Sequence, residues 1–241
     1  MPKVPKWVAD AMESVFSGKS RKVNIIDVTY INSYLKKITF KGDFKGVKFK
    51  IGQAIVIRVD DMNFRNYTPS YWNSDEGVFE VIFHLHGNGP GSDYISNLNL
   101  NDTLNISLPR GFDLYKKDYH YHFFFGDETA IGLFKSLKQV IDENDQNYIG
   151  VLEVDANSWN VKLTSECMLD VVPTSTNKAE NAILFLESLD DSIWNLWKNG
   201  FFYLIGNAKS IQNFRKALKE KGVSGKHMLT QPYWMEGKIG L

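Results

Sequence analysis

The segment YHYHFFFGDETA, Tyr119–Ala130, separates two different sequence patterns. Its apolar run predicts a buried strand over 119–125, and the apolar spacing that follows predicts a helix over 129–141. Downstream, the sequence predicts strands over 148–154 and 201–205 and helices over 179–189, 192–198 and 210–221. Strands that alternate with helices are typical of a parallel α/β sheet. We therefore expect an α/β nucleotide-binding-type domain in this half of the chain.

The residues before this segment follow another pattern. Short β-branched and alternating runs predict strands over 22–31, 34–41, 52–59, 77–85 and 103–108. Apart from a helix expected over 7–16, few helical stretches interrupt them. This pattern indicates an antiparallel barrel or sandwich. We place the boundary in the polar stretch 114–118, which gives domains of 1–116 and 117–241.

Composition limits the possible classes of function. The chain has 241 residues, with 28 basic and 28 acidic side chains, so it has no net charge to attract nucleic acid. The single cysteine, Cys167, excludes an internal disulfide framework and fits a reducing compartment. Neither a secretory signal pattern nor an apolar run of membrane-spanning length is present in the sequence. We expect a cytoplasmic protein with no membrane attachment.

The first motif with chemical potential is RNYTPS, Arg65–Ser70. Arg65 and Tyr67 are two residues apart on an extended segment, so their side chains point to the same side. A guanidinium there can hold a phosphate in a fork while the phenol ring covers a planar ring system, and Thr68 offers a hydroxyl on the other side. An ordinary surface arginine and tyrosine on an edge strand would have the same pattern.

The second motif is HGNGPGS, which runs from His86 to Ser92 before a short predicted helix. Glycines let the backbone approach a ligand closely, and the N–H groups of a helix N-terminus can accept a pyrophosphate. The alternative is a glycine-rich connection in which Ser92 caps the helix.

The third motif is GDETA, Gly126–Ala130, at the strand-to-helix turn where a doubly wound sheet binds ligands. It lacks the G-x-G-x-x-G pattern. Asp127 and Glu128 also suit a helix N-terminus without a ligand and would repel a phosphate. The spacing alone predicts a crevice.

Taken in order, these segments resemble the siderophore-interacting protein family, FAD-dependent ferric-siderophore reductases of the ferredoxin–NADP reductase-like group. RNYT is similar to the family's R-x-Y-T flavin signature, HGNGPGS to its H-G-x-x-G-P-A-S turn and GDETA to its second-domain turn. ISLPRGF, Ile106–Phe112, resembles the strand that closes its barrel, and Tyr233-Trp234 with Gly237 resembles its C-terminal Y-W-x-x-G. The resemblance implies a six-stranded antiparallel barrel domain followed by an α/β domain.

The resemblance also implies roles for particular residues. Those implied to bind FAD are Arg65, Tyr67, Thr68, His86, Gly87, Gly91, Ser92 and Thr129. Those implied to line the access route of the nicotinamide or substrate are Gly126, Asp127, Glu128, Tyr233 and Trp234. An excess of basic over acidic residues in 1–60 is compatible with an anionic ferric siderophore.

The chain departs from the family pattern at several positions. Ser70 stands where the family has an arginine, which removes one phosphate contact. Asp155, not an arginine, follows the strand that ends at Val154, so no partner for a 2′-phosphate is evident. NADH and a ferredoxin-type donor are therefore favoured over NADPH.

The implied reaction transfers electrons from NADH, NADPH or ferredoxin through FAD to Fe(III)-siderophores, which releases Fe(II). We expect a monomer with no metal site, and the implied reaction requires no catalytic acid, base or nucleophile from the protein. One alternative is a flavin reductase with another oxidant, such as a quinone or free flavin. Another is a non-enzymatic metal-binding protein that uses the pairs His84/His86 and His120/His122.

Overall fold

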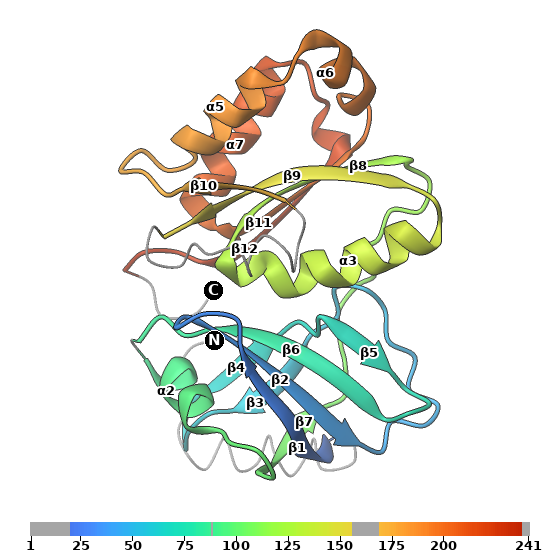
Figure 1. Cartoon of the computed structure of the whole chain (residues 1–241), viewed down its shortest axis with the longest axis vertical. Helices are drawn as coiled ribbons and strands as arrows, with labels where there is room; N and C mark the ends of the chain where they lie inside the picture. The colour runs from blue at the N-terminus through green and yellow to red at the C-terminus, as the bar shows by residue number, and fades with distance from the viewer. Residues whose placement is uncertain (1–19, 88, 156–168, 238–241) are drawn as a thin grey trace. The chain divides into compact units, whose positions relative to one another are not determined.

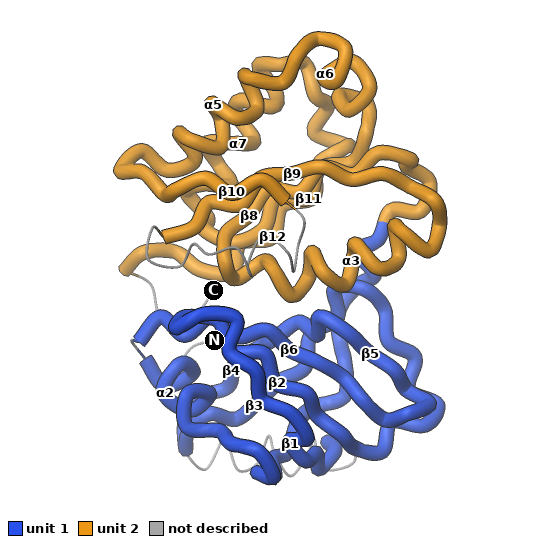
Figure 2. Tube along the Cα trace, viewed as in Figure 1, with its two compact units in different colours: residues 1–115, 240 blue, residues 116–239, 241 orange. Residues whose placement is uncertain are grey.

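The computed structural model describes residues 20–87, 89–155 and 169–237. The helix expected over 7–16 and Cys167 lie outside these residues. The described residues up to Tyr115 form one compact unit, and those from Lys116 onward form a second (Figure 2). Each unit is described separately below.

Unit 1 is a curled antiparallel sheet with one short helix (Figure 1). Its strands are β1 (Ser20–Tyr30), β2 (Leu35–Gly42), β3 (Ile55–Arg58), β4 (Phe64–Tyr67), β5 (Tyr71–Asn73), β6 (Val78–His84) and β7 (Thr103–Ser107), and its helix is α2 (Pro90–Asn97). The strand order is β4-β3-β7-β1-β2-β6-β5. Strands of alternating polarity bury one face, where Phe40 stacks on Phe79 with ring centroids 4.8 Å apart.

The sheet has seven strands, so the expected count of six is wrong. The additional strand is β5, and Pro69 explains why it is separate from β4. Proline has no N–H to donate to a ladder, and the chain bends there. Beyond the bend the Ser70 amide donates to the Glu80 carbonyl at 2.8 Å, so the chain continues along β6. In the part of the chain that the structure describes, β4 and β5 are the two edges of an open sheet.

Unit 2 is a five-stranded parallel sheet with helices on both faces. Its strands are β8 (Tyr121–Asp127), β9 (Asn147–Val154), β10 (Asp170–Pro173), β11 (Phe201–Asn207) and β12 (Met228–Trp234). Its helices are α3 (Ile131–Glu143), α5 (Glu180–Ser188), α6 (Asp191–Trp197) and α7 (Ala208–Glu220), with 3-10 turns η2 (Glu128–Ala130) and η3 (Gly225–His227). The expected α/β architecture is confirmed.

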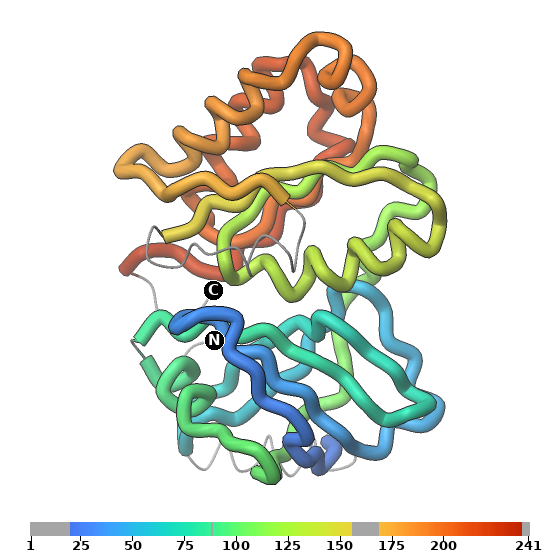
Figure 3. The backbone as a smooth tube through the Cα atoms, viewed as in Figure 1, coloured from blue at the N-terminus to red at the C-terminus, as the bar shows by residue number. Residues whose placement is uncertain are grey.

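The strand order β10-β9-β8-β11-β12 places the change of direction between β8 and β11. Helix α3 lies on one face of the sheet, and α5 and α7 lie on the other (Figures 1 and 3). Apolar residues of β8 and β11 fill the core on the α7 side, where Phe125 stacks on Phe214 with ring centroids 4.0 Å apart. Ligands of such sheets bind at the carboxyl ends of the strands beside this switch point.

Candidate functional site

In unit 1, two side chains of β4 converge on the first turn of α2. A Cβ added to Gly91 would lie 3.0 Å from the Tyr67 hydroxyl and 3.2 Å from Cγ of Arg65. Arg65 and Tyr67 therefore do point to the same side of β4, towards the helix. Gly91 is buried, and these two side chains fill the space beside it, so the lack of a Cβ is what allows β4 to lie this close to the backbone of α2.

The N-terminus of α2 follows a glycine turn. Gly87 and Gly89 have φ of 72° and 106°, a conformation that side chains with a Cβ rarely adopt. None of the described side chains caps the helix. The Ser92 hydroxyl instead accepts the Gly87 amide at 3.1 Å, so the interpretation of Ser92 as a helix cap is wrong. Backbone N–H groups of the first turn thus remain available for an anion.

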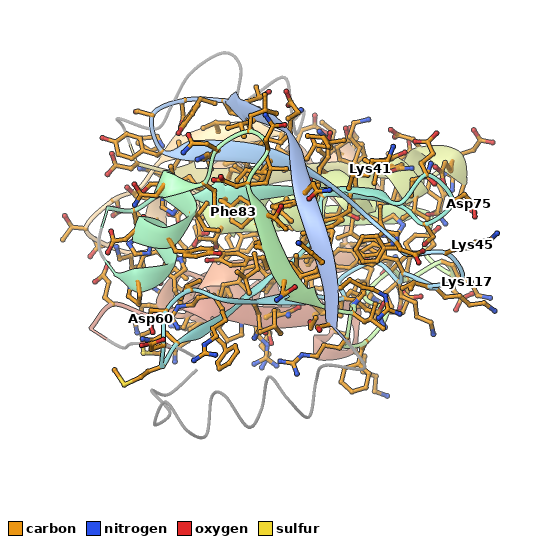
Figure 4. The ribbon with its side chains drawn as sticks, turned by 90° about the horizontal axis from the view of Figure 1, so that it is seen from below. Lys41, Lys45, Asp60, Asp75, Phe83 and Lys117 are labelled. Atoms are coloured by element: carbon orange, nitrogen blue, oxygen red, sulfur yellow. The ribbon has the colours of Figure 1, made fainter. Side chains whose placement is uncertain are left out.

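Tyr67 is half-buried between β6 and α2. Its ring meets Phe83 edge to face with centroids 4.7 Å apart, and burial raises the pKa of its phenol. Figure 4 shows Phe83 in the interior of unit 1. The Arg65 guanidinium donates to the Phe64 carbonyl at 2.9 Å, and among the described residues no carboxylate forms an ion pair with it. Arg65 therefore keeps donors for a ligand.

Ser70 has a structural role in this unit. It is 1% exposed, and its hydroxyl donates to the Glu80 carbonyl at 3.3 Å. A long cationic side chain does not fit this buried position. Phosphate binding in this chain would therefore depend on Arg65 and the helix terminus.

A hollow of about 450 Å³ lies along the other side of α2. Pro90, Asp93 and Tyr94 of the helix line it together with Val59 and Asp60. Figure 4 shows Asp60 at the end of unit 1 that carries α2, opposite Lys41, Lys45 and Asp75. A ligand bound at the helix N-terminus thus has room to extend along the helix.

The glycine turn, the cationic fork and the half-buried phenol fit the diphosphate and planar ring of a flavin dinucleotide. Thr68 follows directly on Tyr67 and is half-buried. His86 is exposed beside the glycine turn, with its Cε1 3.9 Å from a Cβ added to Gly89. Unit 1 thus contains all the residues that the resemblance assigns to FAD except Thr129, and contacts of the α2 turn join Arg65 and Tyr67 to Gly91 and Gly87 to Ser92.

In unit 2, Asp127 joins three strand ends at the switch point. It is 6% exposed, and its carboxylate accepts the amides of Thr129 at 2.9 Å and Asn207 at 2.6 Å. The indole N–H of Trp234 donates to the same carboxylate at 2.8 Å, and the Thr129 hydroxyl also donates to it. With four protein donors, this carboxylate is occupied by the fold itself. Thr129 therefore belongs with Asp127 in unit 2.

Two glycines allow this packing. A Cβ on Gly126 would lie 2.7 Å from both the Ile205 carbonyl and the Ala130 side chain. Gly206 has φ of 120°, and a Cβ there would overlap the Asp127 carboxylate. The glycine of GDETA therefore serves the close contact of β8 with β11 and η2.

Two more carboxylates are buried at this edge. Glu128 accepts the Asp155 amide at 2.6 Å, and burial raises the pKa of Glu128 to about 7. Glu153 lies opposite Asp127 in the β8–β9 ladder, and burial raises its pKa too. The sequence analysis did not single out Glu153. A glutamate near the end of an otherwise apolar strand was the signal for it.

Tyr233 and Trp234 end β12, the edge strand beside β11. Trp234 is 37% exposed, so its ring remains accessible while its N–H is held by Asp127. Tyr233 is half-buried.

The histidine pairs have separate environments. The rings of His84 and His86 lie 6.2 Å apart in unit 1. In unit 2, buried His122 is bonded to Gln146 at 3.0 Å and exposed His120 to Asn147 at 2.9 Å. Across the described ranges, no cluster of three or more histidine, cysteine or acidic side chains is arranged to hold a metal. Likewise, none of the helices in these ranges has the length and apolarity to cross a membrane.

Comparisons with known proteins agree with this geometry. Residues 22–115 match the family model of the oxidoreductase FAD-binding domain, and residues 119–237 match that of the siderophore-interacting proteins. The structure of a siderophore utilization protein from T. fusca is similar, with a TM-score of 0.73 and 19% identity over 92% of this chain and 95% of that one. The siderophore-interacting protein from Aeromonas hydrophila has a TM-score of 0.71 and 19% identity, covering 92% of this chain and 93% of that one. These likenesses show a shared fold.

Among curated proteins, NADH-cytochrome b5 reductase 1 of Candida glabrata is 22% identical over 166 residues, or 65% of this chain. The match spans 58% of that reductase's length. From the two family matches, which follow one another along the sequence, residues 119–237 belong to the siderophore-interacting protein family and residues 22–115 form an oxidoreductase FAD-binding domain.

Proposed function

We propose that this protein is an FAD-dependent reductase that passes electrons from NADH, or from a ferredoxin-type donor, to Fe(III)-siderophores. One observation carries the proposal. Arg65 and Tyr67 converge on Gly91 at the start of α2, within the residues that match the FAD-binding model. The family match of residues 119–237 supports a siderophore as the iron carrier.

Each part of the unit 1 site would take one part of the cofactor. The Arg65 fork and the first-turn amides of α2 would hold the diphosphate, because both present donors to an anion. The Tyr67 ring would lie against the flavin ring system, with the Thr68 hydroxyl at its polar edge. The hollow beside α2 offers room for the adenosine half.

FAD would supply the two-electron chemistry that the side chains lack. One NADH delivers two electrons, which reduce two Fe(III) to Fe(II) and leave NAD⁺ and one proton. Siderophore oxygens hold the hard ferric ion more tightly than Fe(II), so reduction releases the iron. The protein's task is to bind and orient the partners, and no side chain acts as a nucleophile.

The carboxyl edge of the unit 2 sheet supports NADH over NADPH. Asp155 lies there and is exposed, so its carboxylate would repel a 2′-phosphate. The curated relative is named as an NADH-dependent reductase, which points the same way.

The central experiment is anaerobic mixing of the purified protein with NADH, NADPH or reduced ferredoxin while flavin absorbance is followed. We expect a yellow protein whose flavin band bleaches with NADH or ferredoxin and more slowly with NADPH. A protein that neither retains nor binds FAD contradicts the proposal.

The oxidant is tested separately. The prereduced protein is offered ferric siderophores, simple ferric chelates, quinones and free flavin, and reoxidation is timed. Faster reoxidation by ferric siderophores supports the proposed substrate. Equal rates with all oxidants, or faster reoxidation by a quinone, contradict the siderophore assignment and leave a general flavin reductase.

A further inference from the structure

A lysine is buried in the interior of unit 1. Lys36, in β2, is 1% exposed and faces Phe83 across the β2–β6 ladder. Its Nζ donates to the carbonyls of Ile95 at 2.9 Å, Ser96 at 3.1 Å and Leu98 at 2.6 Å. Three acceptors match the three donors of an ammonium, whereas a neutral amine has only two. The side chain is therefore held as a cation.

The three carbonyls belong to the last turn of α2 and its C-cap. Carbonyls at a helix C-terminus have no partners within the helix, and they form the negative end of its dipole. The residue after the C-cap, Leu98, is Asn99, so no glycine closes this helix, and the Lys36 ammonium donates to its last carbonyls. Among the described residues, no carboxylate forms an ion pair with Lys36. Its charge is stabilised by the helix end and by the Tyr30 ring, whose centroid lies 5.4 Å from Nζ.

The opposite end of this helix is the proposed diphosphate site. At about 1.5 Å per residue, an eight-residue helix separates the two ends by about 12 Å. The ammonium fixes one end of α2 to β2, while Gly91 at the other end contacts Arg65 and Tyr67 of β4. It also neutralises the negative end of the dipole, which leaves the positive end to act on an anion.

We infer that Lys36 is a positioning residue for FAD, acting through α2 on the diphosphate. The inference rests on the proposed flavin function. Lys36 orients the N-terminal amides of α2 against Arg65 and adds positive potential along the helix axis. It does not contact the isoalloxazine, so its effect is confined to ligands that carry the diphosphate.

The test compares FAD with riboflavin, which has the ring system and no phosphate. Dissociation constants are measured by flavin fluorescence for the apoprotein and for K36M, which removes the charge at similar volume, with K36R as the conservative variant. K41M, at an exposed position of the same strand, is the matched control. We expect K36M to weaken FAD binding about tenfold and riboflavin less than twofold, with K36R and K41M near wild type.

Each result has a distinct meaning. Equal weakening of FAD and riboflavin shows a general structural role and overturns the inference, as does unchanged FAD binding by K36M. Failure of the wild-type protein to bind FAD overturns the proposed function instead.

A second measurement covers the case in which K36M does not fold. In wild-type protein labelled with ¹⁵N-lysine, the Lys36 ammonium resonance is assigned by its loss in K36R. It should shift when FAD or inorganic pyrophosphate is added and remain in place with riboflavin. A resonance unmoved by FAD contradicts the inference.

Discussion

The two units treat their glycine turns in opposite ways. In unit 1, the turn before α2 leaves backbone amides uncapped by any described side chain, next to an arginine without an ion-pair partner among those residues. In unit 2, the turn after β8 directs its donors onto Asp127, which is filled by protein groups. The amides of the first turn are thus left for the proposed diphosphate, whereas those of the second turn are bound by Asp127.

The difference teaches that a glycine-rich turn has to be judged by where its N–H groups go. Gly91 lets the Arg65 and Tyr67 side chains lie against a helix end, whereas Gly126 and Gly206 make room for other parts of the same sheet. Ligand affinity should therefore respond to changes in the first turn, and folding stability to changes in the second. The following predictions test this contrast, in order of decreasing effect.

The largest effect is expected at the unit 1 turn. Gly91→Val places branched methyls against the Tyr67 hydroxyl and the Arg65 side chain, where even a Cβ has contacts of 3.0 and 3.2 Å. We expect FAD affinity to fall at least about a hundredfold, or about 3 kcal/mol. Flavin fluorescence titration measures it. Ser96→Val adds a similar side chain at an exposed position of the same helix, and similar FAD affinities for both variants would contradict the proposed role of Gly91 in FAD binding.

The second prediction concerns the unit 2 turn. Gly206→Ala combines φ of 120° with overlap onto the Asp127 carboxylate. We expect the free energy of unfolding of unit 2 to fall by about 2–3 kcal/mol, because strain and a displaced buried carboxylate add. Gly222→Ala is the control: φ is 86° there, and no atom of a described residue lies within 4 Å of the added Cβ. It introduces backbone strain without a clash and should lower the free energy of unfolding by about 1 kcal/mol.

Denaturant unfolding measures both alanine variants, and FAD titration accompanies it. Equal losses at 206 and 222 would show that Asp127 is not crowded by Gly206. A lowered FAD affinity in a folded Gly206→Ala protein would contradict the prediction that the unit 2 turn affects folding stability and not FAD binding.

The third prediction uses the pH dependence of Glu128. Because its pKa is about 7 in the fold against 4.5 for the ordinary side chain, the folded protein holds a proton that the unfolded chain releases between these values. The free energy of unfolding should therefore decrease as pH rises through this window, by about 1–2 kcal/mol after partial hydration is allowed for.

Glu128→Gln should remove this part of the pH dependence and stabilise the protein at pH 8 relative to wild type. Unfolding in denaturant at pH 5 and pH 8 measures it. Glu187→Gln, at an exposed position on α5, should leave the slope unchanged. An unaltered slope in Glu128→Gln would contradict the assignment.

The smallest effect is expected for Arg65→Lys. Lysine retains the charge and loses the planar fork, so FAD binding should weaken about fivefold, or about 1 kcal/mol, while riboflavin binding stays constant. Arg58→Lys on β3 is the matched control. Equal effects of both substitutions on FAD affinity would indicate that the two positive charges act alike, and that the Arg65 guanidinium does not hold the diphosphate through paired hydrogen bonds.

Local pattern was enough to predict most of the fold. Alternating apolar residues marked β1, β2, β6 and β7, and the apolar runs of β8 and β11 marked the centre of the parallel sheet. The sequence analysis missed β5, β10 and β12. β5 and β10 have three and four residues, and Pro232 lies inside β12, where only an edge strand tolerates proline.

The site was only partly predictable for a different reason. Arg65 and Tyr67 are neighbours on one strand, so their common direction followed from strand geometry. Asp127 meets donors 80 and 107 residues away, and Lys36 meets carbonyls 59 to 62 residues away. No periodicity encodes such partners, because the fold brings them together. The burial of Ser70 likewise follows from its pairing with β6.

The enclosed ammonium of Lys36 has a practical consequence. Amine-reactive reagents modify surface lysines readily, but this nitrogen can react only when β2 and α2 separate. The rate at which Lys36 is labelled therefore reports how often β2 and α2 of unit 1 separate. Peptide mapping after timed acetylation would therefore measure the rate of that opening at a native side chain, with no engineered probe.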